Sequence, residues 1–259
     1  MNVGIIGLGN VGLACQKGFE LVGNTVRIHD TKLGTNITDV LDTSIVYICV
    51  PTPENVDRSC DTTIVQSVIE QLDSLKYKGI VALKSTSEPG STNKFNSMFN
   101  LKFCCVPEFL REKTAMEDFI INNKLLAVGC YTKDVFDLVV ESHGILAKNA
   151  VMLTPNEAEI LKYYSNVFNA TRVVFANIMY ELCQEYQADY DKIKNAYLLR
   201  QTASPDYMDC ADTLRGYGGM CLPKDTKAIG ALLKKLNMPY DLFDSVHADN
   251  QKFKTTLKK

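Results

Sequence analysis

A cysteine in a glycine-rich segment has the clearest potential for covalent chemistry in this sequence. Cys221 lies in the stretch GYGGMCLPKD, residues 216–225, where Lys224 and Asp225 follow it within one helical turn. A glycine loop can expose a thiol, and a nearby cation and a helix N-terminus both favour the reactive thiolate. A lone cysteine is more often a small buried apolar residue. In this setting we predict a nucleophile instead.

A second glycine-rich segment, GLGNVG at residues 7–12, has the spacing of a dinucleotide-binding turn. It follows an apolar run and opens a helical pattern, so a pyrophosphate could sit on exposed amides at a helix N-terminus. The next apolar run ends at Asp30, whose carboxylate could accept hydrogen bonds from ribose hydroxyls and would repel a 2′-phosphate. We therefore expect NAD rather than NADP. The predicted contacts are Gly7, Gly9, Asn10, Val11, Gly12 and Asp30.

The first half of the chain alternates short apolar runs with helical patterns. These elements would position the glycine turn and Asp30. Strands are predicted at residues 3–6, 25–29, 45–50, 80–83, 102–105 and 125–128, and helices at 11–22, 64–75 and 135–141. The gap at residues 30–44 has room for one or two helical turns. The alternation predicts an α/β fold with a Rossmann-like parallel sheet covered by helices.

From residue 154 onward the pattern is almost wholly helical. Thr154, Pro155 and Glu157 form a helix start signal, with a cap, a proline in the first turn and a capping-box glutamate. Apolar positions then recur at helical spacing for many turns, and further helices are predicted at 190–199, 226–236 and 240–254. We predict an NAD-binding domain at residues 1–153 and an all-helical domain, with a long spine helix and the cysteine, at residues 154–259.

Composition excludes several classes of protein. With 28 basic and 30 acidic residues the net charge is −2, which disfavours a nucleic-acid binder. The apolar runs are strand-length, so no membrane span is expected, and no basic region precedes the first of them, so no secretory signal is expected. The nine cysteines are scattered without a CxxC pair, which favours reduced thiols in the cytoplasm. The three histidines form no cluster with cysteines, so no metal site is expected.

GYGGMCLPKD resembles the catalytic-cysteine motif of the UDP-glucose/GDP-mannose dehydrogenase family, whose NAD-dependent enzymes oxidise a sugar C6 alcohol to a carboxylate. Further stretches fit the family in the right order: GLGNVG at 7–12, ICVPTP at 48–53, KST at 84–86 and VPEFLRE at 106–112. AEILKYYSN at 158–166 matches the family pattern AE-x-x-K-x-x-x-N. The resemblance covers nearly the whole chain.

The resemblance implies roles for the matched residues. Cys221 would capture the intermediate aldehyde as a thiohemiacetal, which is oxidised to a thioester and then hydrolysed. Lys162 and Asn166, one helical turn apart, would stabilise the developing oxyanion. Asp225 would assist proton transfer with a water that Thr86 helps to hold, and Glu108 would flank the reacting groups. The remaining implied contacts are Thr52, Thr86, Glu112 and Lys224 for the cofactor, and Glu108, Lys162, Asn166 and Gly218 for the substrate.

Two features depart from the family pattern. Family members usually continue into a third domain that grips the nucleotide of the sugar nucleotide, and this sequence ends about where that domain would begin. Residues 204–215 lack the usual Arg-Ile pair and have Arg215 where an aromatic residue is common. Both departures concern substrate recognition rather than redox chemistry. We expect oxidation of UDP-glucose to UDP-glucuronate, by a homodimer formed through the helical domain, as in the family.

Two alternatives stay open. A 3-hydroxyacid dehydrogenase also combines a Rossmann domain with a helical domain that carries a lysine and an asparagine on one face, but its single hydride transfer needs no thiol. An NAD-binding protein without turnover is the other alternative. The presence of Cys221, Lys162, Asn166 and Asp225 together argues against both.

Overall fold

The computed structural model describes residues 1–200 and 204–253, and the chain divides into two compact units. Unit 1 comprises Met1–Pro53 and Cys60–Lys162, and unit 2 comprises Glu54–Ser59 and Tyr163–Lys259. The division falls inside the long helix α6, Pro155–Glu185. The first turns of α6 therefore belong with unit 1 and the rest with unit 2. The assignment of functions to residues 1–153 and 154–259 stays a prediction.

Unit 1 contains a seven-stranded sheet with the strand order β2-β1-β3-β4-β5-β6-β7. The strands are β1 Asn2–Ile6, β2 Thr25–His29, β3 Ile45–Ile48, β4 Ile80–Leu83, β5 Lys102–Cys105, β6 Leu126–Gly129 and β7 Ala150–Leu153. Neighbouring strands are parallel except β5 and β6, which are antiparallel. The predicted α/β class with a mostly parallel sheet is confirmed.

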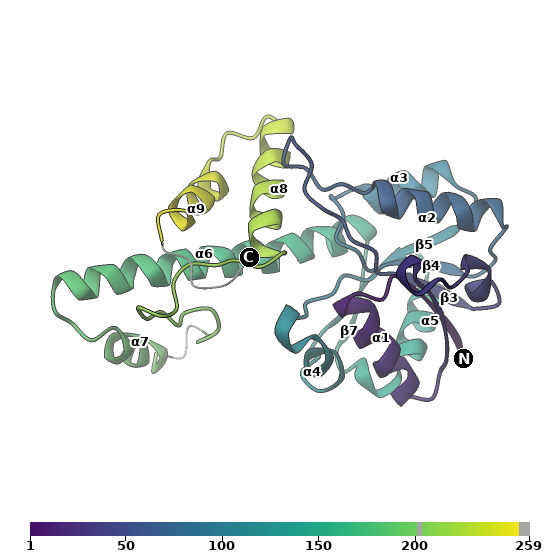
Figure 1. Cartoon of the computed structure of the whole chain (residues 1–259), viewed down its shortest axis with the longest axis horizontal. Coiled ribbons are helices and arrows are strands. Elements are labelled where there is room, and N and C mark those ends of the chain that lie inside the picture. The colour runs from purple at the N-terminus through teal and green to yellow at the C-terminus, as the bar shows by residue number, and fades with distance from the viewer. Residues whose placement is uncertain (201–203, 254–259) are drawn as a thin grey trace. The chain divides into compact units, whose positions relative to one another are not determined.

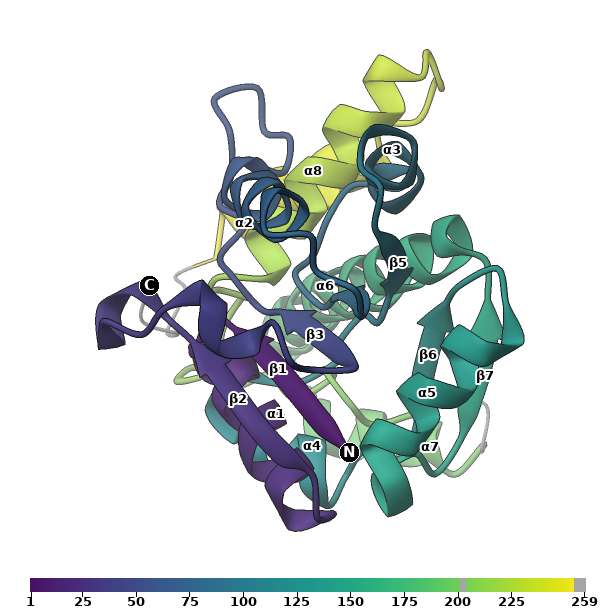
Figure 2. The same ribbon diagram turned by 90° about the vertical axis from the view of Figure 1, so that its right-hand side faces the viewer.

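Helices cover both faces of this sheet. They are α1 Asn10–Leu21, α2 Thr63–Ser74, α3 Ser91–Met98, α4 Ala115–Ile120 and α5 Lys133–His143. Along β3, Ile45 and Tyr47 pack with residues of α1, α4 and α5, whereas Val46 and Ile48 pack with residues of α2 and α3. This alternation of side chains places one core on each face of the sheet. Figure 2 shows helices on both sides of the strands. Short 3₁₀ helices complete the unit: η1 Thr31–Leu33, η2 Ile37–Val40, η3 Glu112–Thr114 and η4 Gly144–Leu146.

Three short elements of unit 1 were not predicted from the sequence: α3, α4 and β7. Helices α3 and α4 have eight and six residues, and β7 has four. Elements of this length give too few repeats for a helical or strand period to stand out. The two short 3₁₀ helices between Asp30 and Ser44 agree with the prediction for that gap.

Unit 2 is helical, and α6 is its longest element (Figure 1). The other helices are α7 Tyr190–Leu198, α8 Leu222–Lys235 and α9 Leu242–Asn250. Helix α8 begins four residues before the predicted start at 226, because Pro223 is compatible with a first helical turn. The last helix is predicted at 240–254, but α9 ends at Asn250 and residues 251–253 form a turn and a bend; residue 254 lies outside the described residues.

The start of α6 follows the predicted signal. The hydroxyl of Thr154 accepts a hydrogen bond from the amide of Glu157 at 3.4 Å, and the Glu157 carboxylate accepts one from the Thr154 amide at 2.7 Å. These reciprocal bonds form the capping box. In unit 2, α6 then contributes to two small cores. Their members are Ala170, Val174, Tyr217, Val246 and Phe253 in the first, and Ala176, Tyr180, Cys183, Tyr190 and Cys210 in the second.

Among residues 1–200 and 204–253, no helix has the length and apolar character needed to cross a bilayer.

Candidate functional site

The glycine turn after β1 is closed by direct backbone contacts. Gly7 has a φ of +90°, and a Cβ atom there would lie 2.9 Å from the backbone of Cys49. A Cβ on Gly12 would lie 1.9 Å from the carbonyl oxygen of Gly7. A side chain at Gly12 would push α1 away from the end of β1, and one at Gly7 would push the turn away from the segment after β3, so the turn requires glycine at both positions.

Gly9 has a different reason to be glycine. It is the N-cap of α1, its φ of −72° is open to other residues, and a Cβ there would meet nothing within 4 Å. The chain itself therefore does not require glycine at this position. The position adjoins the first turn of α1, and a pyrophosphate could approach the N-terminus of that helix.

Asp30 is fixed beside this turn at the end of β2. One carboxylate oxygen accepts a hydrogen bond from the Leu8 amide at 2.7 Å, and the other accepts one from the Lys32 amide at 2.8 Å. The bond from Leu8 is the main cause that holds the pKa of Asp30 below its ordinary value. The carboxylate is thus charged and still has lone pairs for ribose hydroxyls. Glycine turn and carboxylate together fit an NAD.

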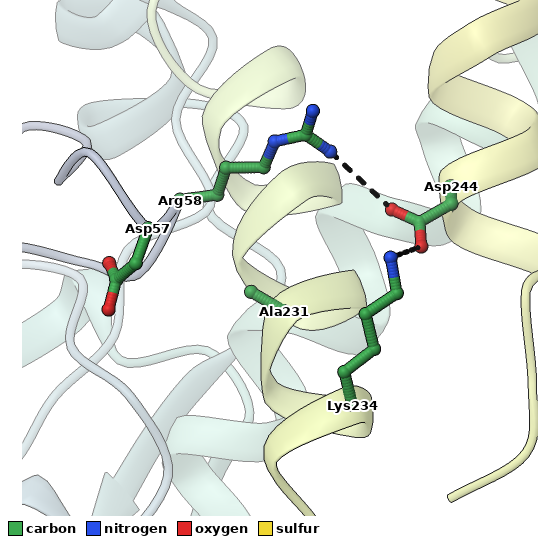
Figure 3. A pocket seen from close by; sticks show the side chains of 5 residues that line it. All are labelled: Asp57, Arg58, Ala231, Lys234 and Asp244. Atoms are coloured by element: carbon green, nitrogen blue, oxygen red, sulfur yellow. Dashed lines mark ion pairs between the residues drawn. The ribbon is translucent and has the colours of Figure 1, made fainter.

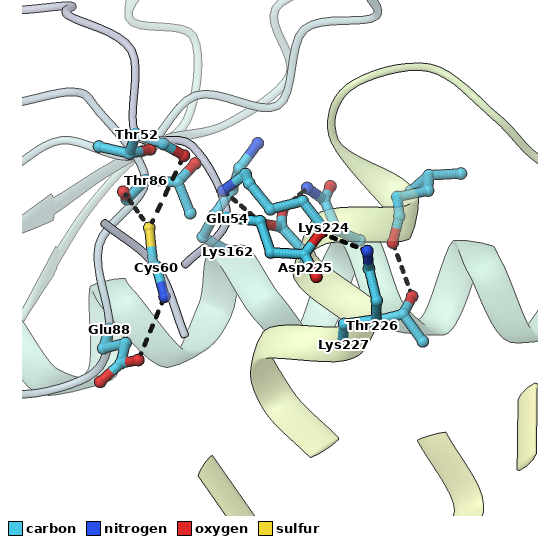
Figure 4. Close-up of polar contacts among 12 residues, drawn as sticks. Thr52, Glu54, Cys60, Thr86, Glu88, Lys162, Lys224, Asp225, Thr226 and Lys227 are labelled. Atoms are coloured by element: carbon cyan, nitrogen blue, oxygen red, sulfur yellow. Dashed lines mark hydrogen bonds and ion pairs between the residues drawn. The ribbon is translucent and has the colours of Figure 1, made fainter. Parts of the chain in front are cut away.

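Thr52 and Thr86 follow β3 and β4, whose carboxyl ends lie side by side in the sheet. Cys60, which no sequence motif indicated, connects the loop after β3 with the loop after β4. Its thiol lies 3.3 Å from the carbonyl oxygen of Thr86 and 4.0 Å from that of Thr52, and its amide donates to the carboxylate of Glu88 at 3.3 Å (Figure 4). The two predicted cofactor contacts are therefore brought together in unit 1.

Lys162 and Glu108 form a buried ion pair in unit 1. The Lys162 ammonium donates to the carbonyl oxygen of Glu108 at 2.6 Å and to its carboxylate at 2.9 Å, and the two side chains are 5% and 9% exposed. Burial acts to raise the pKa of Glu108, but the charge and hydrogen bond of Lys162 outweigh it, so that the pKa lies below its ordinary value. Lys162 is therefore not a solvent-exposed charge on the surface of α6.

Glu159, one turn earlier in α6, is a further buried acid that the sequence analysis gave no role. Its carboxylate accepts hydrogen bonds from the amides of Gly90 and Thr92 at 2.6 and 2.8 Å, and from the Thr92 hydroxyl at 2.6 Å. It therefore caps the N-terminus of α3, which the helix dipole favours. The family pattern that contains Lys162 also contains this glutamate, and that was the available signal.

In unit 2 the predicted nucleophile stands at the start of α8. Cys221 is the N-cap residue, it is exposed, and its carbonyl accepts the first helical bond from the Asp225 amide at 2.9 Å. The Asp225 side chain is 1% exposed, accepts a hydrogen bond from the Asn166 amide at 2.6 Å and pairs with the Lys224 ammonium at 2.9 Å (Figure 4). Unit 2 thus brings four of the predicted residues together.

Two predicted residues have a less defined setting. Gly218 is half-buried in the segment before Cys221, and Glu112 is exposed at the first residue of η3. Neither takes part in the contacts described above. Their roles stay predictions.

Unit 2 also contains a cavity of about 380 Å³. Its lining residues are Asp57, Arg58, Ala231, Lys234 and Asp244 (Figure 3). Asp244 pairs with Arg58 at 3.8 Å and with Lys234 at 2.5 Å. The two cations and two carboxylates balance, so the wall offers no net charge to a ligand, and none of the predicted site residues lines it. In the described part of the chain, no cluster of three or more His, Cys, Asp or Glu side chains could hold a metal ion.

Comparison with known proteins identifies the family. Residues 31–141 match the NAD binding domain of the UDP-glucose/GDP-mannose dehydrogenase family, and residues 156–252 match its central domain. The chain belongs to the UDP-glucose/GDP-mannose dehydrogenase family, and the part that matches the NAD binding domain supports the predicted cofactor. The similarity predicted from the motifs is confirmed.

Individual proteins agree with this assignment. The UDP-glucose 6-dehydrogenase of Rickettsia bellii is 26% identical over 97% of this chain and 67% of its own length. A UDP-glucose dehydrogenase structure from the archaeon Pyrobaculum islandicum matches with a TM-score of 0.87 and 24% identity, over 97% of this chain and 68% of that one. The first curated relatives are matched over 49% to 67% of their own length.

A solved structure also bears on the 3-hydroxyacid alternative. The 3-hydroxyisobutyrate dehydrogenase of Mycobacterium tuberculosis matches with a TM-score of 0.78 and 12% identity, over 97% of this chain and 92% of that one. At this identity the likeness shows a shared fold and no shared chemistry.

Proposed function

We propose that this chain catalyses the NAD-dependent oxidation of the C6 alcohol of a nucleotide sugar to a carboxylate in two steps, with UDP-glucose as the first candidate substrate. The observation that carries the proposal is the setting of Cys221. The thiol is exposed at the N-terminus of α8, while Asp225 and Asn166 form a buried pair in the first turn of that helix. A single oxidation of an alcohol would need no such thiol.

The cofactor would be held by the glycine turn, with the pyrophosphate at Gly9, Asn10 and Val11 and the adenosine ribose at Asp30. Thr52, Thr86, Glu112 and Lys224 are the further proposed contacts. When bound, NAD supplies the acceptor for the hydride that leaves the sugar carbon.

The residues of the chain would perform the remaining steps. The C6 alcohol becomes an aldehyde when its hydride passes to NAD and its hydroxyl proton passes to the water beside Asp225. The Cys221 thiolate attacks the aldehyde carbon, and the carbonyl electrons move to the oxygen, which Lys162 and Asn166 stabilise by donating hydrogen bonds. After loss of the second hydride the thioester is attacked by water, and the thiolate of Cys221 leaves. Asp225 takes the proton of that water, which Thr86 helps to hold. Glu108 keeps Lys162 charged and in place beside the substrate, which Gly218 also contacts.

The test is the number of NADH molecules formed per product. The protein is incubated with NAD and separately with UDP-glucose, GDP-mannose and simple 3-hydroxyacids, and absorbance at the NADH band is compared with product by mass spectrometry. Two NADH per acid from a nucleotide sugar would support the proposal. One NADH per ketone from a hydroxyacid would support the alternative enzyme, and NAD binding without turnover would support a binding protein.

We further propose a homodimer through the helical domain, because α6 carries an exposed apolar stripe. The residues are spaced by three, four or seven positions and are 45% to 77% exposed: Tyr164, Phe168, Phe175, Ile178, Leu182 and Tyr186. A helix with an apolar face of this length needs a partner to cover it. A second copy of the chain fits, since the stripe would be self-complementary across a two-fold axis.

Light scattering at micromolar concentration tests the dimer. We expect a mass twice that of the chain, and half that mass for the double variant Phe175→Lys, Ile178→Lys. Leu242→Lys is the matched control, because it places the same charge at an exposed apolar position of α9. A monomeric wild type would exclude the proposal.

We propose the cytoplasm as the compartment, because no disulfide joins any of the nine cysteines in the part of the chain that the structure describes. Reducing compartments keep thiols in this state. Fractionation of cells that produce the tagged chain tests this, and recovery outside the cytoplasm would contradict it.

A further inference from the structure

The segment that carries Cys221 is rich in glycine and needs an anchor. Gly216 and Gly219 have φ values of +63° and +76°, and Gly219 and Met220 are exposed. Glycine segments have many accessible conformations, so a nucleophile on such a loop is well placed only if the loop is tied to rigid elements. The helical bond from Asp225 to Cys221 ties its far end. The near end is tied by two side chains with no role in the chemistry proposed above.

Asn250, at the end of α9, binds both main-chain groups of Tyr217. Its side-chain oxygen accepts a hydrogen bond from the Tyr217 amide at 2.8 Å, and its side-chain nitrogen donates to the Tyr217 carbonyl at 3.0 Å. Asn250 is 2% exposed and Tyr217 is 2% exposed. The side-chain amide of Asn250 thus pairs with both the N–H and the C=O of Tyr217. Burying these backbone groups without partners would lower the stability of the fold.

Asn177, on α6, holds the two residues before Tyr217. Its oxygen accepts hydrogen bonds from the Gly216 amide at 3.0 Å and from the Arg215 guanidinium at 2.7 Å, and Asn177 is 1% exposed. Arg215 also lies over the rings of Tyr180 and Phe253, 5.3 and 5.4 Å from their centres. The segment is therefore fixed from 215 to 217 by buried amides, four residues before the thiol.

We propose that Asn250 is a positioning residue for Cys221: by pairing with the Tyr217 backbone it holds the glycine loop in the conformation that keeps the thiol at the N-terminus of α8. The proposal rests on the proposed function in that it takes Cys221 as the nucleophile. Without the amide, the buried main-chain groups of Tyr217 lose their partners, and the loop leaves this conformation to find others. The thiol then spends less time where the amides of the helix favour its thiolate form.

The experiment measures how fast iodoacetamide alkylates Cys221 between pH 5 and pH 10, by mass spectrometry of the peptide that contains it. Of the other eight cysteines seven are buried and Cys49 is half-buried, so the exposed Cys221 reacts first. This readout needs no turnover, so it stands whether or not the proposed oxidation is observed. The variant is Asn250→Asp, which keeps the shape and places an oxygen against the Tyr217 carbonyl. Asn250→Ser, a milder change, serves if the aspartate variant does not fold.

We expect the alkylation rate at pH 7 to fall three- to tenfold in the Asn250 variant, and to equal the wild-type rate near pH 10, where an exposed thiol is almost fully ionised in both proteins. Val246→Ala is the matched control, since Val246 is buried in the same core and on the same helix. Val246→Ala should lower the melting temperature without removing a hydrogen bond to the loop. The pH profile of the Cys221 alkylation rate in this variant should therefore coincide with that of the wild type. Superimposable profiles for wild type and the Asn250 variant would overturn the proposal, and so would an equal shift in Val246→Ala.

Where turnover is measurable, a second readout applies. We expect kcat to fall at least tenfold in the Asn250 variant while the KM for NAD stays within about twofold. If kcat falls and the KM for NAD rises by similar factors, Asn250 has a general structural role instead.

Discussion

The two glycine loops of this chain are held in different ways. The turn at residues 7–12 is closed by backbone packing, with Gly12 against Gly7 and Gly7 against Cys49. The loop at residues 216–221 is held by buried side-chain amides from helices that lie 33 and 39 positions away in sequence. Steric closure requires particular residues within the loop itself, whereas anchoring by amides requires residues elsewhere. The first is therefore visible as a motif, and the second is not.

The largest effect is expected for Cys221→Ser. A serine alkoxide is harder to form at neutral pH, and an ester is hydrolysed less readily than a thioester. Steady-state NADH production should fall by orders of magnitude while a covalent adduct accumulates, which mass spectrometry would detect. NAD binding by calorimetry should be unchanged, because the other loop is untouched. Full activity of the Cys221→Ser enzyme would show that Cys221 is not the nucleophile. Met220→Leu, a change at the exposed neighbouring residue, is the control.

The next effect concerns the buried ion pair of Lys162 and Glu108 in unit 1. It contrasts with the uncharged amides of Asn177 and Asn250, which hold the cysteine loop in unit 2. Lys162→Met leaves the buried Glu108 without its cation, which should lower the free energy of unfolding by about 3–5 kcal/mol at pH 7. Denaturant titration measures this.

The pH dependence of that loss has a definite sign. Because the folded-state pKa of Glu108 is lowered, the pair contributes its stability above the ordinary glutamate value of about 4.3, and loses it as pH falls through the folded-state pKa. The difference between wild type and Lys162→Met should therefore shrink at acid pH. A difference that does not change with pH would contradict the ion pair.

A matched pair of glycine variants separates steric closure from ligand access in the nucleotide turn. Gly12→Ala places a methyl group against the Gly7 carbonyl and should lower the free energy of unfolding by roughly 1–3 kcal/mol and weaken NAD binding. Gly9→Ala meets open space and changes only the N-cap residue of α1, so it should lower the free energy of unfolding by no more than about 1 kcal/mol while NAD binding weakens. Unchanged NAD affinity in Gly9→Ala would argue against a pyrophosphate at this helix N-terminus.

The effect that is smallest near neutral pH is a pH dependence of the core of unit 1. His143 is fully buried beside Phe19, and burial lowers its pKa to about 3, with the charge of Lys84 acting in the same direction. Its folded-state pKa lies below the ordinary value of about 6.5, so the unfolded chain takes up a proton first as pH falls. Stability should decline below pH 6.5 by about 1.4 kcal/mol per pH unit. His143→Phe should reduce the slope of the free energy of unfolding against pH. An identical slope in this variant would show that His143 does not cause the pH dependence.

The sequence by itself determined the parts whose cause is local. The glycine spacing at 7–12, the carboxylate of Asp30, the capping box at Thr154 and the glycines around Cys221 each act within a few residues, and the alternation of apolar runs is enough for the fold class. The family motifs added Lys162, Asn166 and Asp225. The structure shows all three buried, with Asn166 and Asp225 hydrogen-bonded and Lys162 paired with Glu108.

Only the tertiary structure decided which side chains hold these parts in place. Cys60 between two loops, Glu159 at the start of α3, and Asn250 on the Tyr217 backbone pair with groups 26 to 69 positions away. Cys60 and Asn250 belong to none of the motifs named above, and Glu159 lies in the family pattern but the pattern does not say what the carboxylate binds. The role of each residue arises from burial, because a polar group removed from water must find a partner, and the partner is set by how distant segments pack.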